Sequence, residues 1–357
     1  MLASPTLVSS NLGHLLKFHH LKAPVNNLHH HSSKIHLARS TKSNPPYLNK
    51  TSPPIKIASR ALARLRRLTC TMSTTATTPS STGAAPWRPL FNTHISKMDS
   101  PEFVLSSLHA APQGAPVSHL PRARYCIYRG MWGELPENGR NVAPRNARVY
   151  ESDLLTLTTD VRMEKVPEIF ATGAGHGDVA QSQGSGGGGP VEAVFWVKGV
   201  MAQWRIRGDA FVVARDIEGG GEESSGVRTV KSAVGERMRV VSEEGKEAWS
   251  WNTELTAHFG NLSPGMRGSF KNPAPGTPVG STPGEGLGMG QKVDDLEDEV
   301  ARKNFRVVII KPEVVELCDL SDPERSRRWR YTFVGPNAQS GEGAEILGEW
   351  KKEELWP

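Results

Sequence analysis

The first 98 residues of this chain contain no aspartate or glutamate. They hold 13 of its 43 lysines and arginines, which leaves 30 cations against all 37 acids in residues 99–357. The net charge of +6 therefore combines a basic N-terminal segment with an acidic remainder. Because an acidic surface repels a phosphate backbone, no nucleic-acid partner is expected for the remainder. An RNA contact would have to use the basic segment.

Cysteine and long apolar runs are also scarce. The chain has three widely spaced cysteines, Cys70, Cys126 and Cys318. This spacing excludes a disulfide scaffold and a cysteine-based zinc or iron–sulfur site. The histidine run at 29–31 has no acidic neighbours, so no metal site is expected there. No apolar run approaches the ~20 residues that span a bilayer, and no membrane association is expected.

Aromatic residues are rare in residues 1–86, which contain one phenylalanine, one tyrosine and no tryptophan. Such a segment cannot bury enough apolar area to fold, so we expect a disordered basic extension. Within it, residues 57–68 alternate apolar and arginine faces at helical spacing, as in a mitochondrial targeting segment. Met72 offers a second start, from which the protein would be cytoplasmic. The sequence leaves both alternatives open.

Order is expected from residue 87 to residue 357, in one domain made mainly of β-strands. Ser100 and Pro101 indicate the start of a helix, and a short helix is expected at 162–170. Gly/Ser/Pro-rich linkers are expected at about 173–190, 218–226 and 273–290. Many short strands with few helices between them favour an antiparallel barrel. The expected strands are 120–129, 149–158, 191–197, 203–214, 305–311, 314–317 and 329–333.

A group of cations and polar residues falls on or beside these strands. If the strands are neighbours, the group suits a phosphate monoester, because guanidinium forks bind its oxygens and lysine adds a point charge. A glutamine beside it can hydrogen-bond a flat heterocycle. The alternative is that these are exposed strand charges paired with Glu134, Glu151 or Glu164. The candidate residues are Arg124, Arg129, Thr158, Thr159, Arg162, Lys165, Gln203 and Arg205.

Seven stretches in order resemble the pyridoxamine 5'-phosphate oxidase-like FMN-binding split-barrel family, in the branch found in bacteria and fungi. Together they cover roughly residues 87–357. The resemblance implies a six-stranded antiparallel split β-barrel that forms a homodimer and holds FMN at the subunit interface. The stretches are Trp87–Phe91, Pro121–Gly130, Leu155–Val166, Val191–Gly208, Leu262–Gly276, Asn304–Leu317 and the terminal WKKEELWP.

The resemblance also implies roles for the candidate residues. Arg124 opens the first strand that contacts FMN, and Arg129 stands where the oxidases carry a lysine. The two threonines, Thr158 and Thr159, run under the flavin. Arg162 and Lys165 resemble the phosphate-binding pair, and Gln203 matches the glutamine that contacts the isoalloxazine ring. We further expect Arg162 and Lys165 to share one face of the helix that they begin.

Two departures separate this chain from the true vitamin B6 oxidases. Their Arg-x-His motif is replaced by Arg325–Arg328, which contains no histidine, and Leu317-Cys318 stands where they carry a flavin-contacting tryptophan. The sequence therefore indicates an FMN-dependent oxidoreductase with an unknown small-molecule substrate and no assignable catalytic acid or base. The alternative is a flavin-binding or flavin-sensing module without turnover.

Overall fold

The computed structural model describes residues 83–173, 182–219, 223–336 and 344–357. The proposed targeting segment at 57–68, the alternative start at Met72 and most of the extension expected at 1–86 lie outside these residues. In the described ranges, no helix combines the length and the apolar character that a membrane span requires.

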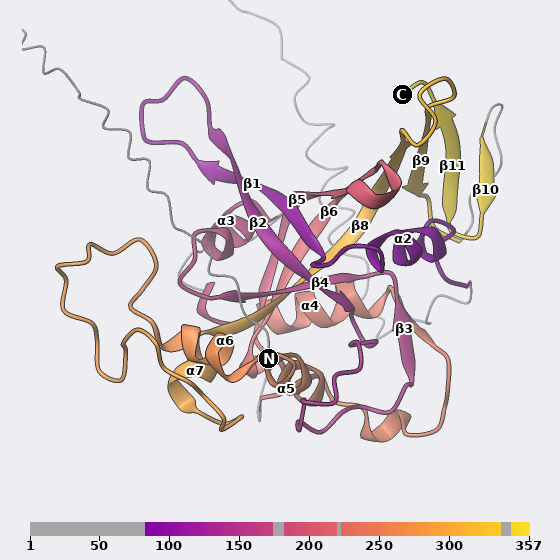
Figure 1. Cartoon of the computed structure of the whole chain (residues 1–357). Coiled ribbons are helices and arrows are strands. Elements are labelled where there is room, and N and C mark those ends of the chain that lie inside the picture. Colours follow the sequence, from indigo (N-terminus) through magenta and orange to yellow (C-terminus); the bar gives the residue numbers. More distant parts are fainter. Residues whose placement is uncertain (1–82, 174–181, 220–222, 337–343) are drawn as a thin grey trace, which may run out of the picture. The chain divides into compact units, whose positions relative to one another are not determined.

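Six antiparallel strands close into a ring (Figure 1). In spatial order, each strand pairs with the next, and the last pairs with the first. This confirms the predicted six-stranded antiparallel barrel and the mainly β fold class. The strands of the ring are β1 (Glu102–Ala110), β2 (His119–Met131), β4 (Leu155–Asp160), β8 (Phe305–Asp319), β6 (Ala202–Val213) and β5 (Gly186–Val197).

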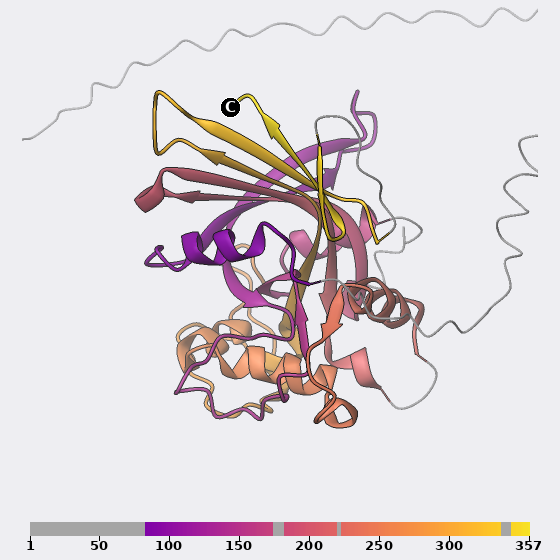
Figure 2. The same ribbon diagram turned by 90° about the vertical axis from the view of Figure 1, so that its right-hand side faces the viewer.

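The sheet continues beyond the ring, because β8 is long enough to pair with a further strand after it has closed the barrel. Strand β9 (Arg327–Phe333) pairs with β8, followed by β11 (Trp350–Leu355) and the short edge strand β10 (Glu345–Leu347) (Figure 2). A separate two-stranded sheet joins β3 (Tyr150–Ser152) and β7 (Met238–Val240).

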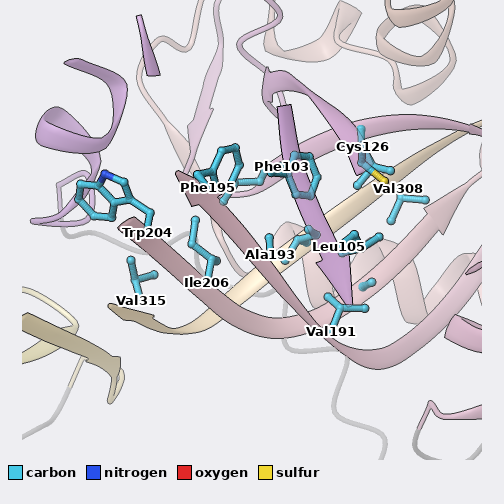
Figure 3. Close-up of a cluster of buried hydrophobic side chains, with 14 of the residues drawn as sticks. Phe103, Leu105, Cys126, Val191, Ala193, Phe195, Trp204, Ile206, Val308 and Val315 are labelled. Carbon is cyan, nitrogen blue, oxygen red and sulfur yellow. The ribbon is translucent and has the colours of Figure 1, made fainter. Parts of the chain in front are cut away.

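The barrel interior is filled by apolar side chains that alternate along the strands (Figure 3). On β1, Phe103 and Leu105 point inward, and Phe103 stacks on Phe195 of β5 with ring centroids 4.8 Å apart. Helix α2 (Arg88–Ile95) places Phe91 edge-on against Phe195 and Trp204. Helix α3 (Lys165–Ala171) adds three apolar side chains to the same cluster, Val166, Ile169 and Phe170.

A second apolar cluster lies between the barrel and a group of helices that we call the helical cover. On β8, Phe305, Val307 and Ile309 point to the cover, whereas Val308 and Ile310 point into the barrel. Burial on both faces explains the continuous apolar run of this strand. The cover consists of α4 (Ser225–Gly235), α5 (Trp251–Gly260), α6 (Pro264–Gly268) and α7 (Glu299–Asn304), with 3-10 turns at Arg215–Glu218, Lys246–Ala248 and Ser269–Lys271. A further 3-10 turn, Lys198–Val200, joins β5 to β6.

Several element boundaries differ from the sequence-based expectations. The helix expected after Ser100 is wrong: this stretch is strand β1, because its apolar residues alternate toward the barrel interior. Residues 149–158 divide into β3 and β4, and the two strands expected between residues 305 and 317 are one strand, β8. Residues 225–235, assigned partly to a linker, form helix α4, capped by the Ser224 hydroxyl.

The glycine run before residue 191 belongs to β5, which begins at Gly186. Gly187 has φ +99°, a conformation that favours glycine, beside a register shift against β6. A Cβ on Gly189 would lie 2.5 Å from the Ile169 carbonyl oxygen of α3. These glycines allow α3 to pack closely against β5. Residues 186–190 are therefore part of a strand and not part of the expected linker.

Candidate functional site

A cavity of about 440 Å³ lies where strands β2 and β4 and the start of α3 meet the segment 262–275. This volume falls within the range of small-molecule sites. Four of the eight sequence-predicted residues line it: Arg129, Thr158, Thr159 and Lys165. The cavity is therefore the candidate site, and its walls also include Cys126, Asp160, Met163, Phe270, Asn272 and Pro273.

Lys165, the first residue of α3, places a buried ammonium group at this cavity. Its Nζ donates to the Thr159 hydroxyl at 3.0 Å and lies 3.0 Å from the Met163 sulfur. In the described part of the chain it forms no ion pair, and burial lowers its pKa. A buried ammonium group without a counterion is unfavourable, and an anion in the cavity would relieve that cost.

Arg129 of β2 is the second cation on the cavity wall. Its Nε is buried without a hydrogen-bond partner among the described residues, and no ion pair is seen for its guanidinium there. Burial lowers its pKa, as it does for Lys165. Two cations that form no ion pair in the described part of the chain thus line one cavity, which is the arrangement that a phosphate group would satisfy.

Arg162 has a different role from the one expected. Its guanidinium binds both carboxylate oxygens of Asp160, at 2.9 and 2.6 Å, and donates to the carbonyl oxygens of Phe270 and Asn272 at 3.2 and 3.0 Å. Helix α3 begins at Lys165, so the expectation that Arg162 and Lys165 share a helix face is wrong. Arg162 anchors the cavity wall at residues 270–272 and does not line the cavity.

Arg124 also forms internal contacts. It is five residues from Arg129 on β2 and shares a strand face with Cys126, which is buried in the barrel core. Its guanidinium donates to Glu168 of α3 at 2.8 Å and to the Ser107 hydroxyl. The two arginines therefore do not converge as predicted, and Arg124 holds α3 against the barrel.

Gln203 and Arg205 lie on β6, two strands from β4 around the ring through β8. Their neighbours Trp204 and Ile206 point into the barrel, so Gln203 and Arg205 point outward. Arg205 donates to Glu192 at 2.7 Å. The structure does not bring these two residues to the cavity of their own chain. The alternative of paired strand charges therefore describes Arg124 and Arg205, although their partners are Glu168 and Glu192 and not the expected Glu134, Glu151 or Glu164.

The sequence-based prediction missed the cavity wall formed by residues 262–275. Phe270 and Asn272 contribute to it, and Asn304 holds the Phe270 carbonyl through a 2.8 Å hydrogen bond. The signal was present, because Leu262–Gly276 is one of the stretches that carry the family resemblance. Its position against β2 and β4 depends on contacts across more than 100 residues, which local patterns do not contain.

A buried imidazole lies close to Arg129. His258 of α5 stacks on Trp132 with ring centroids 5.7 Å apart, and neither of its ring nitrogens has a hydrogen-bond partner among the described residues. Burial lowers its pKa to about 3, with smaller effects from Arg129 and Arg145. Its Nε2 lies 3.8 Å from a carboxylate oxygen of Glu254, whose pKa burial raises. His258 is therefore neutral at physiological pH.

Residues 84–214 match the family model described as pyridoxamine 5'-phosphate oxidase, FMN-binding domain. The matched range contains the ring strands β1, β2, β4, β5 and β6 and every cation discussed above. The match confirms the resemblance found in the sequence and its cofactor, FMN. No curated protein matches the chain significantly.

Solved structures give weaker similarities. A pyridoxamine 5'-phosphate oxidase-related, FMN-binding protein from Nostoc punctiforme is 17% identical, with a TM-score of 0.43, and the match covers 77% of this chain and all of that one. PhzG from Burkholderia lata, solved with tetrahydrophenazine-1-carboxylic acid, is 14% identical, with a TM-score of 0.27 over 76% and 89% of the two chains. General stress protein 26 from Bacillus anthracis is 10% identical, with a TM-score of 0.25 over 64% and 92%. Similarity at this level identifies no substrate.

Proposed function

We propose, from the premise that residues 84–214 form an FMN-binding domain of the pyridoxamine 5'-phosphate oxidase family, that this chain is an FMN-dependent oxidoreductase of a small molecule. The observation that carries the proposal is the pair of cavity-lining cations, Lys165 and Arg129, that form no ion pair among the described residues. In this proposal they hold the phosphate of FMN.

Each wall of the cavity has a task in this arrangement. Lys165 supplies a point charge, and its contact with Thr159 fixes the ammonium group in place. Arg129 offers guanidinium donors from strand β2, and Thr158 adds a hydroxyl from strand β4. The segment held by Arg162 excludes water from one side. FMN, when bound, supplies the redox chemistry, and the protein supplies position and electrostatics.

We extend the proposal to a homodimer in which Gln203 serves the site of the second subunit. Gln203 faces outward, and its strand β6 begins beside exposed apolar side chains. Trp196 is 44% exposed and Met201 is 45% exposed, which is unfavourable for an isolated subunit. A symmetric pair would cover this patch on both chains. Sedimentation of the FMN-loaded protein tests this: a monomer that holds FMN tightly would contradict it.

The phosphate assignment is tested by titrating FMN and riboflavin into Lys165→Gln and Arg129→Gln. Loss of one charge-assisted contact should lower the affinity for FMN by about ten- to hundredfold. Riboflavin, which lacks the phosphate, should lose little affinity. Arg122→Gln is the matched control, because Arg122 is exposed on the same strand β2. Equal losses for the two ligands would show that these cations do not bind the phosphate.

A binding module without turnover is the second candidate function. Asp160, a cavity-lining carboxylate, has both of its oxygens bound to Arg162. The two functions differ in one measurement. If the bound flavin is reduced and a small molecule reoxidises it faster than oxygen alone, the chain is an oxidoreductase. If none of a broad panel of acceptors does so, the binding module is favoured.

A further inference from the structure

Three potential metal ligands meet at the rim of the barrel, where α3 packs against β1. They are His109 of β1 and the pair Glu164 and Glu168, one helical turn apart at the start of α3. One ligand atom from each lies within 4.8 Å of the other two. We propose that His109, Glu164 and Glu168 bind a divalent transition-metal ion, with zinc the best fit, at a site separate from the FMN cavity.

Glu168 is held in position for this role. Its carboxylate is buried, and its Oε2 accepts hydrogen bonds from Arg124 at 2.8 Å and from the Ser107 hydroxyl at 2.5 Å. Its Oε1 faces His109 Nδ1 at 3.0 Å. Metal-binding carboxylates are commonly oriented by such outer hydrogen bonds. The contacts of Oε2 orient the carboxylate so that Oε1 and His109 Nδ1 lie side by side, where one ion could bind both.

A hydrogen bond between His109 and Glu168 does not explain why the Glu164 side chain lies beside them. The Glu164 side chain is exposed, and among the described residues it has no ion pair and no side-chain hydrogen bond, yet it lies beside an already anionic group. Two carboxylates at spacing i, i+4 on a helix repel one another unless a cation lies between them. An ion bound to both would turn this repulsion into an attraction.

The donor set selects the kind of ion. One imidazole nitrogen and two carboxylate oxygens match the ligands of zinc, and three protein ligands leave a position for water. Magnesium and calcium prefer oxygen ligands alone. With neutral His109, the two carboxylates and Arg124 sum to one negative charge, so a divalent cation is still attracted. The arginine makes the attraction weaker than it would be beside two isolated carboxylates.

The experiment is a zinc titration of the full chain, followed by calorimetry and thermal unfolding. The parent protein carries His29→Gln, His30→Gln and His31→Gln, because that run could bind zinc by itself. We expect one site per chain and, at about 100-fold excess over Kd, a rise in Tm of roughly 5 °C. Zinc bound equally by folded and unfolded chains would not raise the Tm.

Two variants identify the ligands. His109→Gln and Glu164→Gln should each weaken zinc binding by at least about tenfold and remove about half or more of the rise in Tm. Neither side chain is buried, so both variants should fold. His119→Gln is the control, because this exposed histidine on β2 hydrogen-bonds through its side chain only to Ser118 among the described residues. The proposal is overturned if zinc binding is absent, if it leaves Tm unchanged, or if it survives His109→Gln and Glu164→Gln undiminished.

Discussion

The barrel interior and the layer beneath the helical cover are both buried, but they are built differently. The interior cluster consists of apolar and aromatic side chains in edge and stacked contacts, and Trp87 Nε1 is its one buried side-chain atom without a hydrogen-bond partner among the described residues. The layer beneath the cover combines apolar residues with buried polar atoms that have no hydrogen-bond partner among the described residues, including those of Arg129, Glu254 and His258. The interior therefore stabilises the fold. In the covered layer, the unpaired buried groups lower the free energy of unfolding, and a bound ligand or a proton could pair with them.

The largest effect should come from the interior. Phe195 is fully buried, stacks on Phe103 and contacts Phe91 and Tyr128 edge-on. Phe195→Ala should lower the free energy of unfolding by about 3–5 kcal/mol, because it removes these contacts and leaves a cavity. Denaturant unfolding measures this loss. Phe195→Leu should cost clearly less, and an alanine variant of nearly unchanged stability would show that the interior is not the main source of stability.

The second effect concerns the anchor of the cavity wall. Arg162→Gln removes a two-point contact to Asp160 and the bonds to the carbonyls of Phe270 and Asn272. We expect a loss of about 1.5–3 kcal/mol of unfolding free energy, the range for hydrogen bonds to a charged group. The affinities for FMN and for riboflavin should fall by similar factors, since Arg162 acts by positioning the cavity wall. A loss specific to FMN would instead place Arg162 on the phosphate.

The same contrast explains what the sequence could predict. The barrel strands were recognisable, because alternation along a strand such as β2 is a local pattern. Most of the cover was not predicted, because α4 and α7 follow Gly/Ser/Pro-rich stretches that resemble linkers and α6 and α7 are short. The residues of strand β1 suit a helix by their local sequence, because Ser100 and Pro101 are typical of a helix start. The strand is stabilised instead by the contacts of Phe103 and Leu105 in the barrel interior.

The candidate site was predictable in composition and not in geometry. Lys165, Arg129 and the two threonines were found from their residue types and their place in the family stretches. The sequence could not show that Arg162 and Arg124 form ion pairs with Asp160 and Glu168, because the residue type does not reveal whether an arginine is paired. Nor could it show that Gln203 lies away from the cavity, since that depends on how the ring closes.

The covered layer should also respond to pH. His258 has a pKa of about 3 in the folded chain, against an ordinary value of 6.5. Its contribution to stability is therefore complete above pH 6.5 and is lost as the pH falls toward 3, because only the unfolded chain takes up the proton. Between pH 6.5 and 5, the loss should be about 1.5 kcal/mol.

Glu254, which faces His258, has a raised pKa and gives the opposite trend, with stability lost as the pH rises. His258→Phe keeps a ring against Trp132 and removes the proton site. The difference between the two proteins in unfolding free energy, measured at several pH values, therefore isolates the histidine. A difference that does not change with pH would mean that His258 is accessible to protons in the folded state.

The smallest effect is expected at Arg205, on the outward side of the barrel. Its side chain is 42% exposed and contacts Glu192 at 2.7 Å, with Glu316 at 4.0 Å. An ion pair this exposed is screened by solvent, so Arg205→Gln should change the free energy of unfolding by less than about 1 kcal/mol. The effect should shrink further at high salt, whereas the losses at Phe195 should not. Denaturant unfolding of Arg205→Gln at low and high salt measures this.

The protein concentration separates two other outcomes. A loss of unfolding free energy as large as that of Arg162→Gln in a dilute sample, where a dimer dissociates, would mean that the pair of Arg205 and Glu192 stabilises a single chain. A loss that appears only at concentrations where the protein associates would place Arg205 in the subunit interface proposed around Gln203.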